Sequence, residues 1–143
     1  VTDPQNLGAI ARTAECAAAT GVILPGRRSA EVTPAVCKAS AGAVEHLAVA
    51  RVRNLADWLA GAKDAGAWVY GAAAGADRAH TDVDWSGRAV LVLGSEGEGI
   101  RPRVAAACDE LVSIPVRGRI DSLNVSAAAA VILFEAVRQA ETG

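Results

Sequence analysis

The chain's most informative stretch is Ile120-Asp121-Ser122-Leu123-Asn124-Val125-Ser126, and an apolar run from Ala127 to Phe134 follows it. The apolar run predicts a helix. A helix begins with unpaired backbone N–H groups, which Ser, Asn and Asp side chains can satisfy. One capping residue is enough for that purpose, whereas this turn carries four polar side chains. Such an excess at a helix N-terminus is typical of a small-ligand site. These residues alone therefore leave a cap and a site as equal interpretations.

A glycine-rich segment forms the second notable feature. Gly94-Ser95-Glu96-Gly97-Glu98-Gly99 follows an apolar run, Ala89 to Leu93, that predicts a buried strand. The spacing is not that of the dinucleotide fingerprint, and no Lys follows as in a phosphate loop. Two carboxylates would repel a phosphate, so the loop favours a cationic or hydrogen-bond-donating ligand. The alternative is a tight turn in which glycines supply unusual dihedral angles.

The third feature lies at the start of the chain, from Asp3 to Ala14, where Asn6 and Arg12 lie near or on the first predicted helix. An offset of six residues is less than two helical turns, so the two side chains need not share a face. The guanidinium of Arg12 is either a surface group whose stem lies along the helix or an anchored functional group.

Together these three segments resemble, in order, the three motifs of the SpoU (TrmH-like) branch of the SPOUT RNA methyltransferases. The resemblance covers nearly the whole chain, and Ser122 to Ser126 is closest to the 23S rRNA guanosine 2′-O-methyltransferases. It implies an α/β fold with a mostly parallel sheet and flanking helices. It also implies a C-terminal trefoil knot, in which the chain after Ile114 threads behind the loop at Gly94.

The activity implied by the resemblance is transfer of a methyl group from S-adenosylmethionine to a ribose 2′-hydroxyl of RNA, with large-subunit rRNA favoured over tRNA. Three alternatives stay open: a tRNA 2′-O-methyltransferase, a non-catalytic cofactor- or RNA-binding module of the same fold, and an unrelated α/β enzyme for a small nucleotide ligand. The family also implies a homodimer paired through the first and last helices. The last helix, apolar on nearly every side, favours such a partner independently.

The resemblance also assigns roles to individual residues. The catalytic residues would be Arg12, Glu96 and Asn124, supported by Asn6 and Ser122. An Arg stays protonated at ordinary pH, so Arg12 would orient the hydroxyl and stabilise developing charge instead of acting as a general base. The cofactor site would comprise Gly94, Ile114, Leu123, Glu96, Gly97, Ser122, Asn124 and Val125.

Length and composition suit one globular domain. The chain has 143 residues, of which 52% are hydrophobic, with one Phe, one Tyr and no Met. The core must therefore be built from Ala, Val, Leu and Ile, with Trp58, Trp68 and Trp85 as large fillers. The lack of Met and the start at Val1, inside the first motif, indicate that an N-terminal segment is absent from this chain. We expect residues 1–143 to be a catalytic domain that is accompanied elsewhere by an RNA-binding domain.

Charge and cysteine usage exclude several classes of protein. A net charge of −2 argues against a self-sufficient nucleic-acid binder, although close arginine pairs could grip phosphates. Cys16, Cys37 and Cys108 have no metal-ligand spacing and His46 and His80 are isolated, so we expect neither a metal site nor a disulfide framework. The cysteines are expected to be small buried hydrophobic residues. No apolar run reaches the ~18 residues of a membrane span, and the cytoplasm is the default location.

The hydrophobic pattern alternates between strands and helices throughout, which predicts an α/β protein. The first helix is expected to run from Leu7 to Ala18 with Gly21 as its stop, and residues 75–88 are expected to form a polar surface loop. The other expected helices are 34–40, 55–65, 102–108 and 125–140, and the other expected strands are 22–24, 47–52, 67–70, 89–93 and 111–114.

Overall fold

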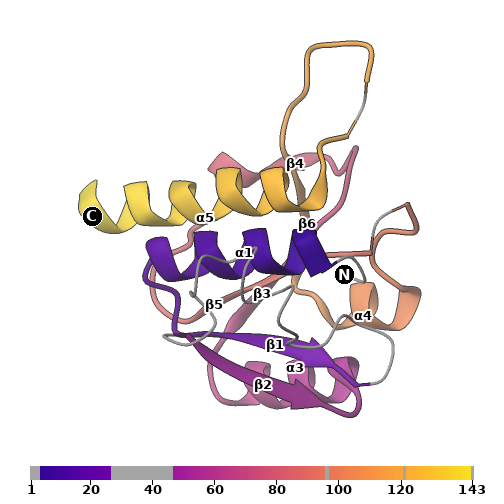
Figure 1. The fold of residues 1–143 in the computed structure, drawn as a ribbon, viewed down its shortest axis with the longest axis vertical. Coiled ribbons are helices and arrows are strands. Elements are labelled where there is room, and N and C mark those ends of the chain that lie inside the picture. Colours follow the sequence, from indigo (N-terminus) through magenta and orange to yellow (C-terminus); the bar gives the residue numbers. More distant parts are fainter. Residues whose placement is uncertain (1–3, 27–46, 96, 121, 143) are drawn as a thin grey trace. The chain divides into compact units, whose positions relative to one another are not determined.

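A computed structural model describes residues 4–26, 47–95, 97–120 and 122–142 (Figure 1). The chain divides into two compact units, Val1–Leu55 and Ala56–Gly143, which are described one at a time. The expected short helix at residues 34–40, together with Cys37 and His46, lies outside the described residues.

The first unit contains one helix and two parallel strands. Helix α1 spans Pro4–Cys16, strand β1 spans Gly21–Pro25 and strand β2 spans Ala48–Val52. The strands pair in register from Gly21 opposite Ala48 to Pro25 opposite Val52. Leu7 of α1 and Leu24 of β1 are buried together, and Val22 and Val49 pack against them. The predicted strands at 22–24 and 47–52 are therefore confirmed.

The end of α1 differs from the expectation that Gly21 would stop it. The helix ends at Cys16, and Ala18 adopts a positive φ of 58°. The N–H of Ala19 donates to the carbonyl of Ala14 at 2.9 Å, and that of Ala18 donates to Glu15 at 3.0 Å. This bonding is a Schellman ending, which glycine usually provides. Ala18 takes that position here, and Gly21 already belongs to β1.

The second unit is a four-stranded sheet with helices (Figure 1). All its strand pairs are parallel, in the order β4-β6-β3-β5. This arrangement confirms the expected α/β class with a parallel sheet, while the knot stays a prediction. The elements are α3 (Leu55–Asp64), β3 (Trp68–Ala72), β4 (Arg78–Ala79), the short 3-10 helix η2 (His80–Asp82), β5 (Ala89–Val92), α4 (Pro102–Ala107), β6 (Glu110–Ser113) and α5 (Val125–Thr142).

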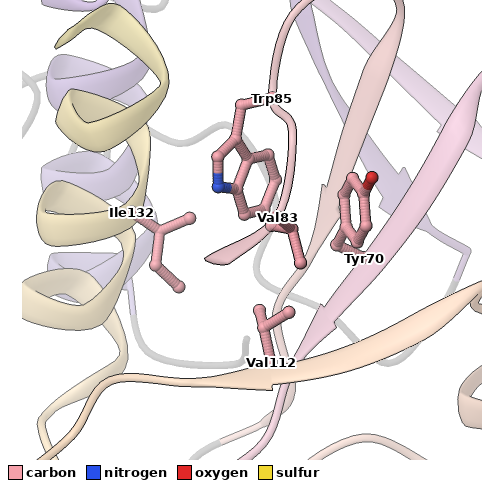
Figure 2. Packing of buried hydrophobic residues seen from close by; sticks show 5 residues of the cluster. All are labelled: Tyr70, Val83, Trp85, Val112 and Ile132. Carbon is pink, nitrogen blue, oxygen red and sulfur yellow. The ribbon is translucent and has the colours of Figure 1, made fainter. Parts of the chain in front are cut away.

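The core of the second unit draws one or two side chains from each of several elements. Figure 2 shows Ile132 of α5, Val112 of β6 and Tyr70 of β3 facing Val83 and Trp85. The rings of Tyr70 and Trp85 are tilted at 59° with centroids 4.7 Å apart, a favourable aromatic geometry. This cluster joins α5 to the sheet.

The segment from residue 75 to 88 is not the surface loop that its polar residues predicted. It contains β4, which pairs with β6, and η2, whose His80 is buried. Val83 and Trp85 are 4% and 6% exposed. The indole N–H of Trp85 donates to the carbonyl of His80 at 2.8 Å, so the polar group of this buried side chain has a hydrogen-bond partner. Asp82 and Asp84, on either side of Val83, hid this pattern.

Two other expectations about burial were wrong. Trp68 is 60% exposed at the first position of β3, so it does not fill the core. Cys16 is exposed and Cys108 is only half-buried, in contrast to the expected small buried residues. Among the described residues, no helix has the length and apolar character needed to cross a membrane.

Candidate functional site

A pocket of about 490 Å³ opens in the second unit where three neighbouring strands end. Strand β3 ends at Ala72, β5 at Val92 and β6 at Ser113, and residues immediately after each of them line the pocket. The strands are parallel, so their carboxyl ends lie along one edge of the sheet, where ligands of open α/β sheets bind. The volume is within the usual range for small-molecule sites.

The pocket wall comes from the strand ends, the glycine loop, the chain after β6 and the first turns of α5. Its described lining residues are Ala72, Ala73, Ala74, Leu93, Gly94, Ser95, Gly97, Gly99, Val112, Ser113, Ile114, Val116, Ser122, Leu123, Asn124, Val125, Ala128 and Ile132. None of these side chains is charged.

The glycine loop is closed by its own backbone. Ser95 and Gly99 exchange two N–H to carbonyl hydrogen bonds of 3.1 Å, which form an isolated antiparallel bridge. Gly97 and Gly99 have φ values of 87° and 73°, which L side chains rarely adopt. A Cβ on Gly94 would lie 2.3 Å from the carbonyl carbon of Gly99. The loop is thus the tight turn that one interpretation predicted, and it also forms part of the pocket wall.

The turn before α5 likewise serves as a cap and as a pocket wall. Asn124 precedes the first residue of α5, and its Oδ1 accepts the backbone N–H of Ser126 at 2.8 Å. Its carbonyl accepts the N–H of Ala128 at 2.9 Å. These bonds satisfy donors of the first helical turn. Within the described part of the chain, the amide nitrogen of Asn124 has no hydrogen-bond partner, although Asn124 lines the pocket.

The structure brings together most of the residues that were assigned to the cofactor site. Around one pocket lie Gly94, Gly97, Ile114, Ser122, Leu123, Asn124 and Val125. Glu96 and Asp121 lie outside the described residues, and Glu98 is exposed. Arg12 and Asn6 belong to α1 of the first unit, where Arg12 is exposed and Asn6 is half-buried.

Sequence reasoning missed the part of the wall contributed by β3. Ala72, Ala73 and Ala74 have side chains too small to suggest a role, yet they line the pocket because β3 is a central strand of the sheet. The signal that could have found them is topological: in a parallel sheet, the residues after a central strand meet the site. Ala128 of α5, which also lines the pocket, was likewise not singled out from the sequence.

The character of the wall restricts the ligand. Small and aliphatic side chains offer close contact to a flat ring, and Ser, Asn and backbone groups offer hydrogen bonds. Among the described lining residues there is no Lys or Arg to neutralise a phosphate chain. A nucleoside without phosphates fits this wall better than a dinucleotide or a nucleoside triphosphate does. No group of His, Cys, Asp and Glu suited to a metal ion occurs in the described ranges.

A polar cluster around the buried carboxylate of Glu135 fixes α5, whose first turns line the pocket. The Glu135 carboxylate accepts bonds from Arg138 at 2.7 and 2.8 Å and from the Gln139 amide at 2.7 Å. Gln139 also donates to the carbonyl of Val83 at 3.0 Å and accepts the N–H of Trp85 at 2.8 Å. The Arg138 and Gln139 donors lower the pKa of Glu135 to about 2. The cluster ties α5 to the segment before β5 at two points.

Comparison with known proteins identifies this arrangement. The sequence model of the SpoU rRNA methylase family matches residues 1–134. The chain belongs to the SpoU rRNA methylase family. Among solved structures, it is similar to the SpoU methyltransferase AviRb from Streptomyces viridochromogenes in complex with the cofactor AdoMet. The TM-score is 0.90 at 34% identity, over 99% of this chain and 58% of that one.

Two relatives carry the names of RNA methyltransferases with different RNA substrates. The 23S rRNA (guanosine-2′-O-)-methyltransferase RlmB of Pseudomonas putida is 47% identical over 97% of this chain and 56% of its own length. An uncharacterized tRNA/rRNA methyltransferase of Synechocystis is 49% identical over 97% of this chain and 36% of its own length. The chain thus spans about half, or less, of these relatives.

Proposed function

We propose that residues 1–143 are the catalytic domain of an S-adenosylmethionine-dependent methyltransferase that modifies a ribose 2′-hydroxyl of large-subunit rRNA. The observation that carries this proposal is the pocket itself, in which Gly94 and Gly97 of one motif meet Leu123 and Asn124 of another. The SpoU relatives with 2′-O-methyltransferase names support the reaction and the rRNA substrate. We place the enzyme in the cytoplasm.

The pocket residues suit the proposed cofactor. Leu93, Ile114 and Leu123 offer aliphatic surface for an adenine ring, while Ser122 and the free amide N–H groups of Asn124 offer polar contacts. S-adenosylmethionine has no phosphate, in keeping with a wall that is uncharged at every described position. When bound, this cofactor supplies an electrophilic methyl group on a sulfonium.

The protein's own residues would then have two tasks, alignment and charge stabilisation. The glycine loop and the Asn124 turn would hold the donor in one orientation, which lowers the barrier by fixing the reacting atoms in line. Arg12 and Asn6 would act on the acceptor side, where a guanidinium stabilises the developing alkoxide. Glu96 or the RNA phosphate would take the proton. These roles follow from family membership and are proposals for this chain.

The deciding experiment combines binding with turnover. Calorimetry should detect S-adenosylmethionine or S-adenosylhomocysteine without added metal, and radiolabelled methyl groups should enter rRNA at a ribose. The expected product is alkali-resistant at the modified position because its 2′-oxygen can no longer attack the neighbouring phosphate. Absence of cofactor binding at millimolar concentration contradicts the proposal, whereas binding without transfer to any RNA indicates the non-catalytic module. Transfer to tRNA but not to rRNA would support the proposed reaction and contradict only the proposed RNA substrate.

We further propose that the protein works as a homodimer that uses α1 and α5. Helix α5 buries Ala129 and Ile132 within its own unit but leaves Val131 and Phe134 41% and 46% exposed. Exposed apolar residues at helical spacing of three form a stripe that a second chain could cover. The first helix was expected to reach Ala18 but ends at Cys16, so the contribution of α1 to the dimer rests on its residues up to Cys16.

A further inference from the structure

The arginines of the second unit fall into two groups. The first group is tied to the fold: Arg78 pairs with Glu110 at 2.7 Å, and Arg138 pairs with Glu135 at 2.7 Å. Arg88 donates to the carbonyl of Ala65 at 2.9 Å. These side chains have structural partners, and they would have to break those contacts in order to bind a ligand.

The second group, Arg101, Arg103, Arg117 and Arg119, is exposed and has no ion-pair or hydrogen-bond partner in the ranges that the structure describes. Arg101 and Arg103 follow Gly99, and Arg117 follows Val116, both of which line the pocket. The described guanidinium groups of this unit that have no partner thus all lie in two segments, each of which directly follows pocket-lining residues along the chain. Positive charge is concentrated there although the whole chain carries a net charge of −2.

The chain after β6 adds an unusual apolar group. Every residue from 115 to 120 is exposed, and Figure 1 shows this orange part of the chain as a loop that extends away from β6 and α5. Ile120 is 80% exposed, more than any other large hydrophobic side chain that the structure describes. An isolated isoleucine next to two unpaired arginines, beside a pocket, lacks a structural reason.

We propose that residues 115–120 are a docking surface for non-helical RNA next to the target nucleotide. This inference rests on the proposed methyltransferase function and names the part of the protein that grips its substrate. Arg117 and Arg119 would each contact a phosphate, since residues two apart are at most about 7 Å apart along the backbone, which suits neighbouring phosphates of one strand. Ile120 would pack against the face of an unstacked base.

The chemistry of the loop favours single-stranded RNA over a duplex. An A-form helix keeps its bases stacked and its deep groove closed to side chains, so an exposed aliphatic group finds no apolar surface there. Loops and bulges present unstacked base faces together with phosphates. The combination of Ile120 with Arg117 and Arg119 matches that mixed surface, whereas arginines alone would serve any nucleic acid.

The first test measures the affinity of the 143-residue chain for a stem-loop RNA across a range of salt concentrations. The variant Arg117→Gln/Arg119→Gln removes two charges from the loop. Its control, Arg53→Gln/Lys63→Gln, removes one charge just before α3 and one in its last turn, and neither residue belongs to the described pocket wall. Two lost phosphate contacts should reduce the slope of log affinity against log salt by about 1.4 for a single strand. The control should keep the original slope.

The second test separates the apolar contact from the charges. Ile120→Ala should weaken stem-loop binding several-fold without changing the salt slope, and it should leave binding to a fully paired RNA duplex unchanged. Trp68→Ala is the control, because Trp68 is equally an exposed apolar residue but lies at the amino end of β3, away from the pocket. Calorimetry with S-adenosylmethionine should show the same cofactor affinity for every variant.

Three outcomes would overturn the docking surface without touching the proposed reaction. One is equal salt slopes for the loop variant and its control. Another is an unchanged stem-loop affinity for Ile120→Ala, and the third is a lower sedimentation mass for that variant, which would assign Ile120 to a protein contact. By contrast, loss of cofactor binding in the unmodified chain would contradict the methyltransferase function itself.

Discussion

Oδ1 of Asn124 accepts two bonds from Ser126, one from its backbone N–H at 2.8 Å and one from its hydroxyl at 2.5 Å. Because both partners are donors, the amide oxygen must face Ser126, and the amide nitrogen must face the other way. One side chain therefore caps α5 with its oxygen, while its N–H groups have no partner among the described residues at the pocket wall. The interpretation of this turn as a cap concerns the amide oxygen of Asn124, and its interpretation as a site concerns the amide nitrogen.

Substitution of Asn124 should separate these two tasks. Asn124→Asp keeps an oxygen acceptor for the helix, so its unfolding free energy should stay near that of the unmodified chain, whereas Asn124→Ala should lose about 1 kcal/mol. Both variants lack the amide N–H groups, so both should lose methyl transfer by on the order of a hundredfold. Chemical denaturation and an RNA methylation assay measure the two effects. Normal turnover in Asn124→Asp would remove Asn124 from the catalytic residues.

Gly94→Ala should disable cofactor binding. The new Cβ would fall 2.3 Å from the carbonyl carbon of Gly99, and this contact is with backbone that cannot turn aside. The Ser95–Gly99 bridge must therefore shift, and the pocket wall shifts with it. We expect S-adenosylmethionine affinity to fall at least about tenfold, the equivalent of about 1.4 kcal/mol. Gly61→Ala is the control: it lies in α3 with no atom within 4 Å and should raise helix stability.

Arg12→Ala should abolish methyl transfer and leave cofactor affinity nearly intact. Arg12 is assigned to the acceptor side, whereas the described lining of the pocket that we assign to the donor belongs to the second unit. Loss of a preorganised electrostatic group costs on the order of a hundredfold or more in rate. Parallel calorimetry and methylation assays distinguish the two sides. A variant whose main defect is cofactor binding would contradict the assignment.

The Glu135 cluster should make stability sensitive to acid. Bonds from Arg138 and Gln139 lower the pKa of Glu135 from 4.5 to about 2. Stabilisation by the carboxylate is therefore complete above about pH 4.5, the value in the unfolded chain, and is lost as the pH falls towards about 2. The melting temperature of the unmodified chain should exceed that of Glu135→Gln at pH 7, and this difference should shrink below pH 4.5. A difference that stays constant down to pH 2 would contradict the assigned pKa.

Phe134→Glu should separate the proposed dimer. The unmodified chain should sediment at roughly twice the monomer mass at micromolar concentration, as an interface of standard size allows. A carboxylate at Phe134 would be buried without a partner across the interface, which is costly. Ala140→Glu serves as control because Ala140 is exposed on another side of α5. A chain that is monomeric before any substitution contradicts the dimer.

The sequence was sufficient for the elements that have a strong local signal. The strand at Ala89–Val92 is apolar and β-branched, and α5 is a long apolar helix with a polar turn before it. At Gly66, the φ of 97° and the 2.9 Å bond from its N–H to Lys63 end α3 as expected. The described residues of the second and third motifs line one pocket because each of them follows a strand end or opens a helix.

What the sequence could not reveal depends on partners far away along the chain. The size of Trp85 predicted its place in the core, which is confirmed, but its segment was expected on the surface and is buried because β3 supplies Tyr70 and α5 supplies Ile132, both distant in sequence. Asp82, Asp84 and the polar residues near them predict a surface loop locally, and only the tertiary contacts reverse that prediction. Similarly, Ala18 accepts a left-handed φ that a local pattern would assign to glycine. Tertiary packing overrides the local preference around Trp85, whereas at Ala18 the backbone bonds of the helix end hold the unusual φ.

The position of Trp85 gives this protein an internal optical probe. Its indole is buried, whereas Trp68 is largely exposed and Trp58 is half-buried, so the blue edge of the fluorescence emission belongs to Trp85. Its backbone is tied to α5 through Gln139 at 2.8 Å, and the other end of the same helix lines the pocket. A displacement of α5 during ligand binding would therefore be visible as a change in emission wavelength, without any label attached to the chain.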